Sequence, residues 1–196
     1  MSSLLSLYGA FWLFVIFMVS TPGPANMLLM AAGAQNGFRA MIPFQAGLVC
    51  GKIILNIAVG LGLMTLLAHN ETAYFVLALI SAAYMAYLAL KGWHISPAQE
   101  AGQAIMGFRA GLFVHPLSPK AWVMSSLAYS QFAINFDDGF ASYVIVPLSF
   151  AVAQIIFHSL WCWSGALLGT KIHNSQTLNR SLILLTLAVV IWALFQ

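Results

Sequence analysis

The stretch that decides the fold reads Thr21-Pro22-Gly23-Pro24-Ala25-Asn26, and it follows a predominantly apolar run over residues 4–19. A matching break in the second half reads His115-Pro116-Leu117-Ser118-Pro119-Lys120 and interrupts the apolar run from residue 111 to residue 132. Proline removes a backbone donor and clashes with the preceding turn, so each motif frees several main-chain carbonyls and amides. Inside a bilayer such groups persist only where they are buried in protein or line a wet cavity. Matching breaks in two halves of a chain indicate the binding site of a transporter.

The composition indicates a membrane protein. Of the 196 residues, 62% are hydrophobic and only 6% are charged, whereas a soluble domain carries roughly 25% charged residues. A helix that crosses a hydrocarbon core takes about 20 residues. The apolar runs of suitable length cover residues 4–33, 40–68, 72–92, 110–133, 140–169 and 179–195. We therefore predict an all-α integral membrane protein with six transmembrane helices, of which the first and fourth are broken at their proline motifs.

The basic residues are distributed unevenly between the two sides of such a bundle. Five of them flank the loops after the first, third and fifth predicted helices: Arg39, Lys91, Arg109, Lys171 and Arg180. The loops of the opposite side carry acidic residues instead, namely Glu71, Asp137 and Asp138. Because Lys and Arg stay in the cytoplasm, we predict that both chain termini lie on the non-cytoplasmic side. The positive net charge therefore does not indicate a nucleic-acid partner.

Three predicted helices in each half place the two halves in opposite orientations. We predict one transmembrane transporter domain over residues 1–196, built from two inverted repeats, about 1–92 and about 110–196, joined by a cytoplasmic loop over about 93–109. This is the plan of many secondary carriers. The bilayer is one expected partner, and a homodimer is compatible with so small a bundle.

The proline motifs belong to a longer series of landmarks that resembles the LysE/RhtB superfamily of bacterial amino-acid exporters. The series begins at residues 21–26 and continues with Phe38-Arg39-Ala40, with residues 84–92 at the end of the third helix, and with Phe108-Arg109-Ala110-Gly111-Leu112 leading to Ser118-Pro119-Lys120. The resemblance covers nearly the whole chain. It implies a multi-pass protein of the bacterial plasma membrane that exports amino acids or similar metabolites and is driven by the proton gradient.

Two positions depart from the pattern of that superfamily. Ser118 stands where the superfamily usually has Asn, which keeps a polar group but loses an amide. Lys52 follows Gly51 where many members carry an acidic residue, so a cation replaces an anion near the centre of the second helix. A close similarity to exporters of basic amino acids is therefore not expected.

Two helices carry polar stripes. In the second helix Gln45, Lys52 and Asn56 fall within about 40° of one another around the helix axis. A charge near the bilayer centre costs at least ~2.5 kcal/mol, so Lys52 should face the interior. It either meets a substrate carboxylate or bonds to carbonyls freed at a break. In the fifth helix Gln154 and His158 share a face. His158 either accepts a proton, since His titrates near physiological pH, or packs against another helix.

The candidate substrate site combines these stripes with the two breaks. An unwound helix presents amides at one half-helix start and carbonyls at the end of the other, and these suit the carboxylate and ammonium of a zwitterion. The alternative is a kink that only shapes the bundle. The predicted binding residues are Thr21, Pro22, Gly23, Pro24, Asn26, Gln45, Lys52, Asn56, Pro116, Ser118, Pro119, Lys120, Gln154 and His158.

Other classes of function have less support in the sequence. Hydrolysis needs a Ser–His or Ser–Lys pair with an orienting partner, and no helical spacing supplies one. Zinc chemistry needs clustered ligands, but His115 and His158 lie on different helices. We therefore predict no enzyme, no cofactor and no resident metal. The expected function is export of amino acids or related carboxylate-bearing metabolites; exporters of other solutes or metal ions, and a non-transporting accessory protein, stay as alternatives.

Overall fold

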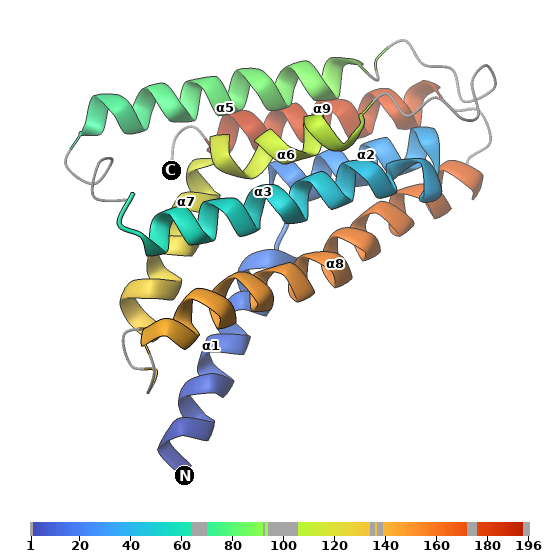
Figure 1. Ribbon diagram of the computed structural model, residues 1–196. Helices are drawn as coiled ribbons and strands as arrows, with labels where there is room; N and C mark the ends of the chain where they lie inside the picture. Colours follow the sequence, from blue (N-terminus) through green and yellow to red (C-terminus); the bar gives the residue numbers. More distant parts are fainter. Residues whose placement is uncertain are drawn as a thin grey trace.

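The computed structural model describes residues 2–63, 70–91, 93, 106–133, 136, 139–171 and 176–193. Regular structure in these ranges is helical throughout, as the sequence predicts (Figure 1). The helices in chain order are α1 (Ser2–Ser20), α2 (Pro24–Asn36), η1 (Arg39–Met41), α3 (Ile42–Gly60), α5 (Glu71–Lys91), α6 (Phe108–Leu117), α7 (Pro119–Leu127), η2 (Ala128–Phe132), α8 (Gly139–Lys171) and α9 (Gln176–Ala193). Asp137, Asp138 and residues 94–105 of the cytoplasmic loop expected over about 93–109 lie outside the described residues.

Most of the expected membrane spans are recognisable in this helix order. Among the described residues, four helices are long and apolar enough to cross a bilayer, and α1 and α2 together form a fifth candidate that is bent by 52°. The expected run over residues 110–133 is divided between α6, α7 and the π-helical turn η2. With 10 and 9 residues, α6 and α7 are each shorter than the about 20 residues that one span needs. The count of six spans therefore stays a prediction.

Both breaks fall at the expected proline motifs. Pro24 is the first residue of α2 and Pro119 is the first residue of α7, a position where the missing amide costs no helical hydrogen bond. Gly23 and Ser118, just before them, have extended backbones. Each motif thus ends one half-helix and starts the next.

The helix α3 ends earlier than the sequence predicts for the second span. We expected a helix to residue 68, but α3 ends at Gly60 and the chain turns at Leu61–Leu63; residues 64–68 lie outside the described residues. Gly62 has a φ of +96°, its amide donates to Val59, and the amide of Leu63 donates to Ala58. This is a Schellman motif, in which a glycine in the left-handed region stops the helix although the sequence stays apolar.

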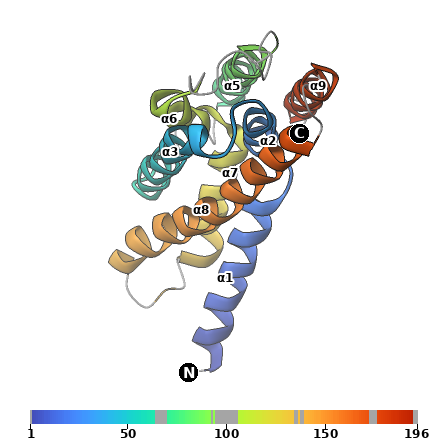
Figure 2. The same cartoon turned by 90° about the vertical axis from the view of Figure 1, so that its right-hand side faces the viewer.

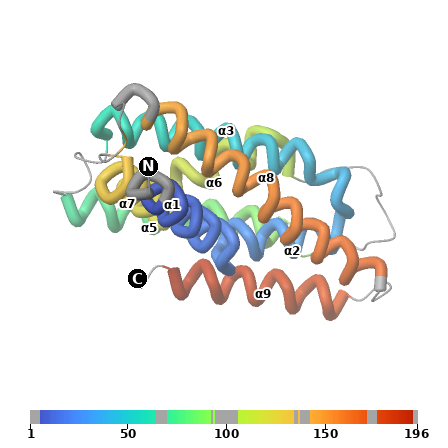
Figure 3. Tube along the Cα trace, turned by 90° about the horizontal axis from the view of Figure 1, so that it is seen from below, coloured from blue at the N-terminus to red at the C-terminus, as the bar shows by residue number. Residues whose placement is uncertain are grey.

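The two larger apolar cores are built by different sets of helices. The first is built by α2, α3, α6, the ends of α5 and α8, and α9, with buried Leu29, Phe44 and Ile183. The second is built by α1, η2 and the first half of α8, with buried Phe11 and Phe150. Figure 2 shows α1 projecting away from the other helices, and Figure 3 shows α8 crossing the bundle diagonally from the end of α3 to the end of α2. The two halves of each broken span therefore pack into different apolar cores.

Close backbone contacts hold the first core together. A Cβ at Gly51 would collide with the carbonyl oxygen of Leu112, which joins α3 to α6. A Cβ at Gly165 would collide with the carbonyl oxygen of Met30, which joins α8 to α2. Small residues allow this approach between membrane helices. The helix ends that carry the basic positions lie beyond this core, on the right-hand side of Figure 1.

Candidate functional site

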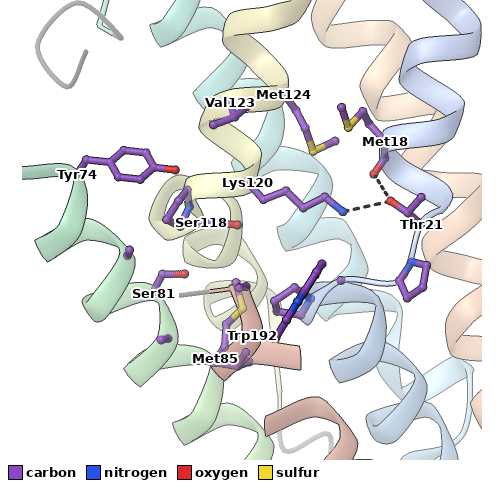
Figure 4. Close-up of a pocket in the computed structure, with 18 residues that line it drawn as sticks. Met18, Thr21, Tyr74, Ser81, Met85, Ser118, Lys120, Val123, Met124 and Trp192 are labelled. Carbon is purple, nitrogen blue, oxygen red and sulfur yellow. Dashed lines mark hydrogen bonds between the residues drawn. The ribbon is translucent and has the colours of Figure 1, made fainter. Parts of the chain in front are cut away.

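A cavity of about 450 Å³ lies between the two breaks and the helices α5 and α9. Its volume is within the range of small-molecule pockets. Its lining includes the breaks at Thr21, Pro22, Gly23, Pro24, Ser118, Pro119 and Lys120, together with Tyr74, Ser81 and Met85 of α5 and Trp192 of α9. We call it the large cavity, and Figure 4 shows its lining residues.

Lys120 is the cation that lines the large cavity. Its Nζ donates to Oγ1 of Thr21 at 3.2 Å, so the second break contacts the first. Figure 4 shows the Lys120 side chain extending from α7 towards Thr21. A Cβ at Gly23 would lie 3.2 Å from the same Nζ, so Gly23 lies close to the ammonium. The ammonium therefore lies where the two broken spans meet.

The carbonyls freed at the first break already have partners. Pro22 and Pro24 lack the amides that would bond Met18 and Ser20, four residues earlier in each case. The carbonyl of Met18 accepts from Oγ1 of Thr21 at 3.2 Å, and that of Ser20 accepts from Nε1 of Trp161 at 3.1 Å. Side-chain donors therefore satisfy the carbonyls that the two prolines of the first break leave without an amide partner.

Asn26 completes this closure. Its Nδ2 donates to the carbonyls of Val19 and Thr21, both at 2.9 Å, and the residue is only 5% exposed. Its Oδ1 has no partner among the described residues. What stays available at the first break is thus the start of α2, where the first amides of a helix have no intrahelical acceptor and carry partial positive charge.

The second break is closed in a similar way. The carbonyl of Pro116 accepts from Nε1 of Trp122 at 2.7 Å, and the amide of Ser118 donates to His115 at 3.0 Å. The carbonyl of Leu112, which Pro116 deprives of its amide partner, packs against Gly51. The start of α7 at Pro119, like the start of α2, borders the large cavity.

A second, small cavity of about 40 Å³ adjoins the breaks on the side of α8. It shares Thr21, Ser118 and Lys120 with the large cavity, and its other lining residues include Asn26, His115, Gln154 and His158. Nε2 of Gln154 lies 3.1 Å from Nε2 of His115, whose ring stacks on that of His158 with 5.7 Å between the centroids. These side chains join the fifth predicted helix to both breaks.

Four of the predicted residues line neither cavity: Gln45, Lys52, Asn56 and Pro116. Nζ of Lys52 is fully buried and donates to the carbonyl of Ala121 and to Oγ of Ser125, each at 2.8 Å. Ser125 in turn donates to Oδ1 of Asn56 at 2.7 Å. Gln45 accepts from Ser159 at 3.1 Å. The polar stripe of α3 thus bonds to α7 and α8.

The large cavity also contains residues that the sequence analysis did not select. Tyr74, Ser81 and Met85 follow one another at helical spacing on one face of α5, and Trp192 lies near the end of α9. Ser81 is 5% exposed and is a polar side chain in an otherwise apolar part of α5, which is the one signal that marks this face.

The chemistry of these cavities is that of binding. In the described part of the chain, no group of three His, Cys, Asp or Glu side chains has a geometry that could hold a metal ion. A cation, two helix starts and several amide and imidazole groups surround a space with mostly apolar walls. This arrangement can recognise a small polar solute through its charged end.

A helical bundle with a cavity between two broken spans is the architecture of a multi-pass membrane transporter. The chain belongs to the LysE type translocator family, whose model matches residues 16–195. This confirms the resemblance seen in the sequence. Proteins of this family and the relatives of this chain are transporters rather than enzymes. No solved structure shows a significant match.

Several characterised relatives cover most of the chain. It is 26% identical to the homoserine/homoserine lactone efflux protein of Salmonella typhimurium, over 74% of this chain and 76% of that protein. It is 24% identical to the cysteine/O-acetylserine efflux protein of Salmonella paratyphi A, over 91% and 93%. It is 26% identical to the cysteine/O-acetylserine efflux protein of Escherichia coli, over 83% and 84%.

Proposed function

We propose that this chain exports a small amino acid or a related metabolite with a neutral side chain. The observation that carries the proposal is the position of Lys120, whose ammonium lies at the meeting point of the two breaks and lines the large cavity. A substrate carboxylate there would meet this ammonium and the positive ends of α2 and α7, which is how broken helices bind anionic groups.

The expected substrate class follows from the cavity walls and from the relatives. Beyond Lys120 the large cavity is lined mainly by apolar residues; its other polar lining residues are Thr21, Tyr74, Ser81 and Ser118. Such walls suit a side chain without charge. The relatives are named for homoserine, homoserine lactone, cysteine and O-acetylserine, whose side chains are small and uncharged. Solutes of this kind are therefore the first candidates.

The proposed topology has six spans in the inner membrane, with α1–α2 and α6–α7 as the broken ones and both termini on the non-cytoplasmic side. Its support is the position of the basic residues at one end of the bundle. The large cavity is lined by residues 74–85 of α5 and 190–193 of α9, which lie towards the opposite end. In this orientation the cavity faces outwards and the glycine contacts close the cytoplasmic half.

This asymmetry supports transport by alternating access between two inverted repeats. Under that arrangement α1 corresponds to α6 and α2 corresponds to α7. The glycine-based contacts of α3 with α6 and of α8 with α2 would loosen in the inward-facing state. We further propose proton coupling through the buried pair of His115 and His158, which lies beside the small cavity.

The proposal is tested by efflux from proteoliposomes loaded with labelled homoserine, cysteine and O-acetylserine. We expect the native protein to release at least one of them faster than empty liposomes, and an imposed proton gradient to change the rate. Lys120→Met should slow this release at least tenfold, whereas Lys91→Met, at the end of α5 beside Tyr87, should not. Equal rates with and without the native protein would contradict amino-acid export. Crosslinking of the same vesicles would show whether the transporter is a homodimer.

A further inference from the structure

Three buried side-chain atoms that have no partner among the described residues belong to residues that line the small cavity. They are Oδ1 of Asn26, Oε1 of Gln154 and Nδ1 of His158, on residues that are 5%, 1% and 3% exposed. All three residues line the cavity of about 40 Å³. Buried polar atoms are nearly always hydrogen-bonded, and unpaired ones are costly. A polar group bound in the small cavity could satisfy these unpaired atoms.

The three unpaired atoms can each accept a hydrogen bond, so a suitable occupant must be a hydrogen-bond donor. Both amide hydrogens of Asn26 are directed to the carbonyls of Val19 and Thr21, so its Oδ1 can only accept. The amide nitrogen of Gln154 faces Nε2 of His115 at 3.1 Å, which leaves Oε1 as the free acceptor. Nδ1 of His158 accepts when the ring carries its proton on Nε2. An ammonium group supplies three donors and no acceptor.

Four main-chain carbonyls at the first break already have donors within the protein. Those of Met18, Val19, Ser20 and Thr21 accept from side chains of the protein itself. A cationic group that enters between the breaks therefore finds its acceptors on α2 and α8 rather than on the unwound backbone.

The two cavities adjoin each other, which suits the two neighbouring charged groups of an α-amino acid. They meet at Thr21, Ser118 and Lys120, which line both. In an α-amino acid one carbon atom separates the ammonium from the carboxylate. A carboxylate on Lys120 therefore places the ammonium next to the same residue, on the side of the small cavity, and shields it from the lysine charge. The volume of the small cavity exceeds the 10–15 Å³ that one water-sized group requires.

We propose that the small cavity is the ammonium subsite of the transporter. Asn26, Gln154 and His158 each accept one hydrogen bond from the substrate ammonium, and Lys120 binds the carboxylate. The substrate side chain then extends into the large cavity, past Ser81 towards Tyr74 and Trp192 (Figure 4). This assignment rests on the proposed function and adds to it the orientation of the substrate.

The test uses three competitors to distinguish binding of the substrate ammonium from binding of its carboxylate. Homoserine carries both charged groups, homoserine lactone carries the ammonium without a free carboxylate, and 4-hydroxybutyrate carries the carboxylate without the ammonium. Each is titrated against efflux of the labelled amino acid that the native protein releases fastest. Half-inhibiting concentrations are measured for the native protein and for Gln154→Leu, His158→Leu and Lys120→Met.

We expect Gln154→Leu and His158→Leu to raise the half-inhibiting concentrations of homoserine and homoserine lactone at least tenfold. The half-inhibiting concentration of 4-hydroxybutyrate should not change. Lys120→Met should raise the half-inhibiting concentrations of homoserine and 4-hydroxybutyrate and leave that of the lactone unchanged. Thr186→Val is the matched control, because Thr186 is a buried polar residue of α9 that bonds within its own helix to Leu182. Equal weakening of all three competitors in Gln154→Leu would overturn the assignment.

A binding measurement keeps this test independent of transport. Homoserine lactone should raise the thermal midpoint of the purified native protein in detergent and should do so less in Gln154→Leu, because a ligand that binds only the folded state stabilises it. If no efflux is seen but the lactone still stabilises the native protein, the transport proposal fails and the subsite stands. If efflux is seen but the lactone neither competes nor stabilises, the subsite is wrong.

Discussion

The side-chain ammonium of Lys52 lies 2.8 Å from the carbonyl oxygen of Ala121, in the first turns of α7. The same ammonium lies 2.8 Å from Oγ of Ser125 and 4.4 Å from the ring centroid of Phe150. Lys52 thereby connects α3 with the half-helix that follows the second break, and with α8. These contacts favour the interpretation in which Lys52 bonds to a carbonyl near a break, because the residue borders neither cavity.

The first prediction concerns the replacement of Lys52 by methionine. We expect Lys52→Met to lower the thermal midpoint in detergent, because each hydrogen bond from a charged donor contributes about 1.5–3 kcal/mol. The half-saturating substrate concentration should change less than about threefold, which is under ~0.7 kcal/mol of binding free energy. Efflux per folded protein and thermal unfolding check the two parts. A native midpoint with a tenfold higher half-saturating concentration would instead place Lys52 in the substrate site.

A second prediction concerns the closed half of the bundle. Gly165 packs on the backbone of Met30, and Gly33 of the same helix α2 packs on the backbone of Cys162, a fully buried thiol. Gly165→Val should separate α8 from α2, because a side chain cannot occupy the space of a backbone. We expect the thiol of Cys162 to react faster with a maleimide in a Cys50→Ala background.

The matched control for that experiment is Gly9→Val. Gly9 lies in α1, and a Cβ built there meets no atom within 4 Å, so the added side chain should change neither packing nor thiol reactivity. Equal labelling of Cys162 in Gly165→Val and in Gly9→Val would show that the α2–α8 contact does not hold this half closed.

A third prediction tests the wall of the large cavity on α5. Ser81 lines the part of the large cavity in which the proposed orientation places the substrate side chain, and Ser81→Leu adds apolar volume there. Efflux of O-acetylserine should fall at least 10-fold more than efflux of the smaller cysteine, since the fit of a methylene-sized group contributes about 1–3 kcal/mol. Ser164→Leu is the control, because Ser164 lines neither cavity and bonds to Leu160 in its own helix. Equal losses for both substrates would show that Ser81 does not limit substrate size.

The breaks could be predicted from the sequence because the effect of proline is local. Pro24 and Pro119 start new helices wherever the rest of the chain lies, and the structure places helix starts at both. The end of α3 was misjudged for a related reason. Residues 61–63 continue the apolar pattern, but the left-handed backbone of Gly62 ends the helix, and hydropathy does not record backbone conformation.

The partners of the polar residues could not be predicted in the same way. Whether Lys52 meets a substrate or Ala121 depends on where α7 crosses α3, and that crossing is set by glycine contacts between α3 and α6. The face of α5 that borders the large cavity was missed because α5 is apolar on most sides. In a membrane helix the hydrophobic pattern does not separate lipid-facing positions from positions that line a cavity.

The last prediction concerns Asn26, whose amide closes the first break. Asn26→Asp keeps the shape of the side chain but replaces two donated hydrogen bonds with an acceptor that faces the carbonyl oxygens of Val19 and Thr21. Leaving such buried groups unpaired costs about 1–3 kcal/mol each, so the thermal midpoint and the folded yield should fall clearly. Asn36→Asp is the control, because the amide of Asn36 donates at 3.1 Å to one carbonyl, that of Ala32, at the partly buried end of α2. If both variants unfold at the same temperature, the closure of the break does not depend on Asn26, and the same residue would then be free to act on the substrate alone.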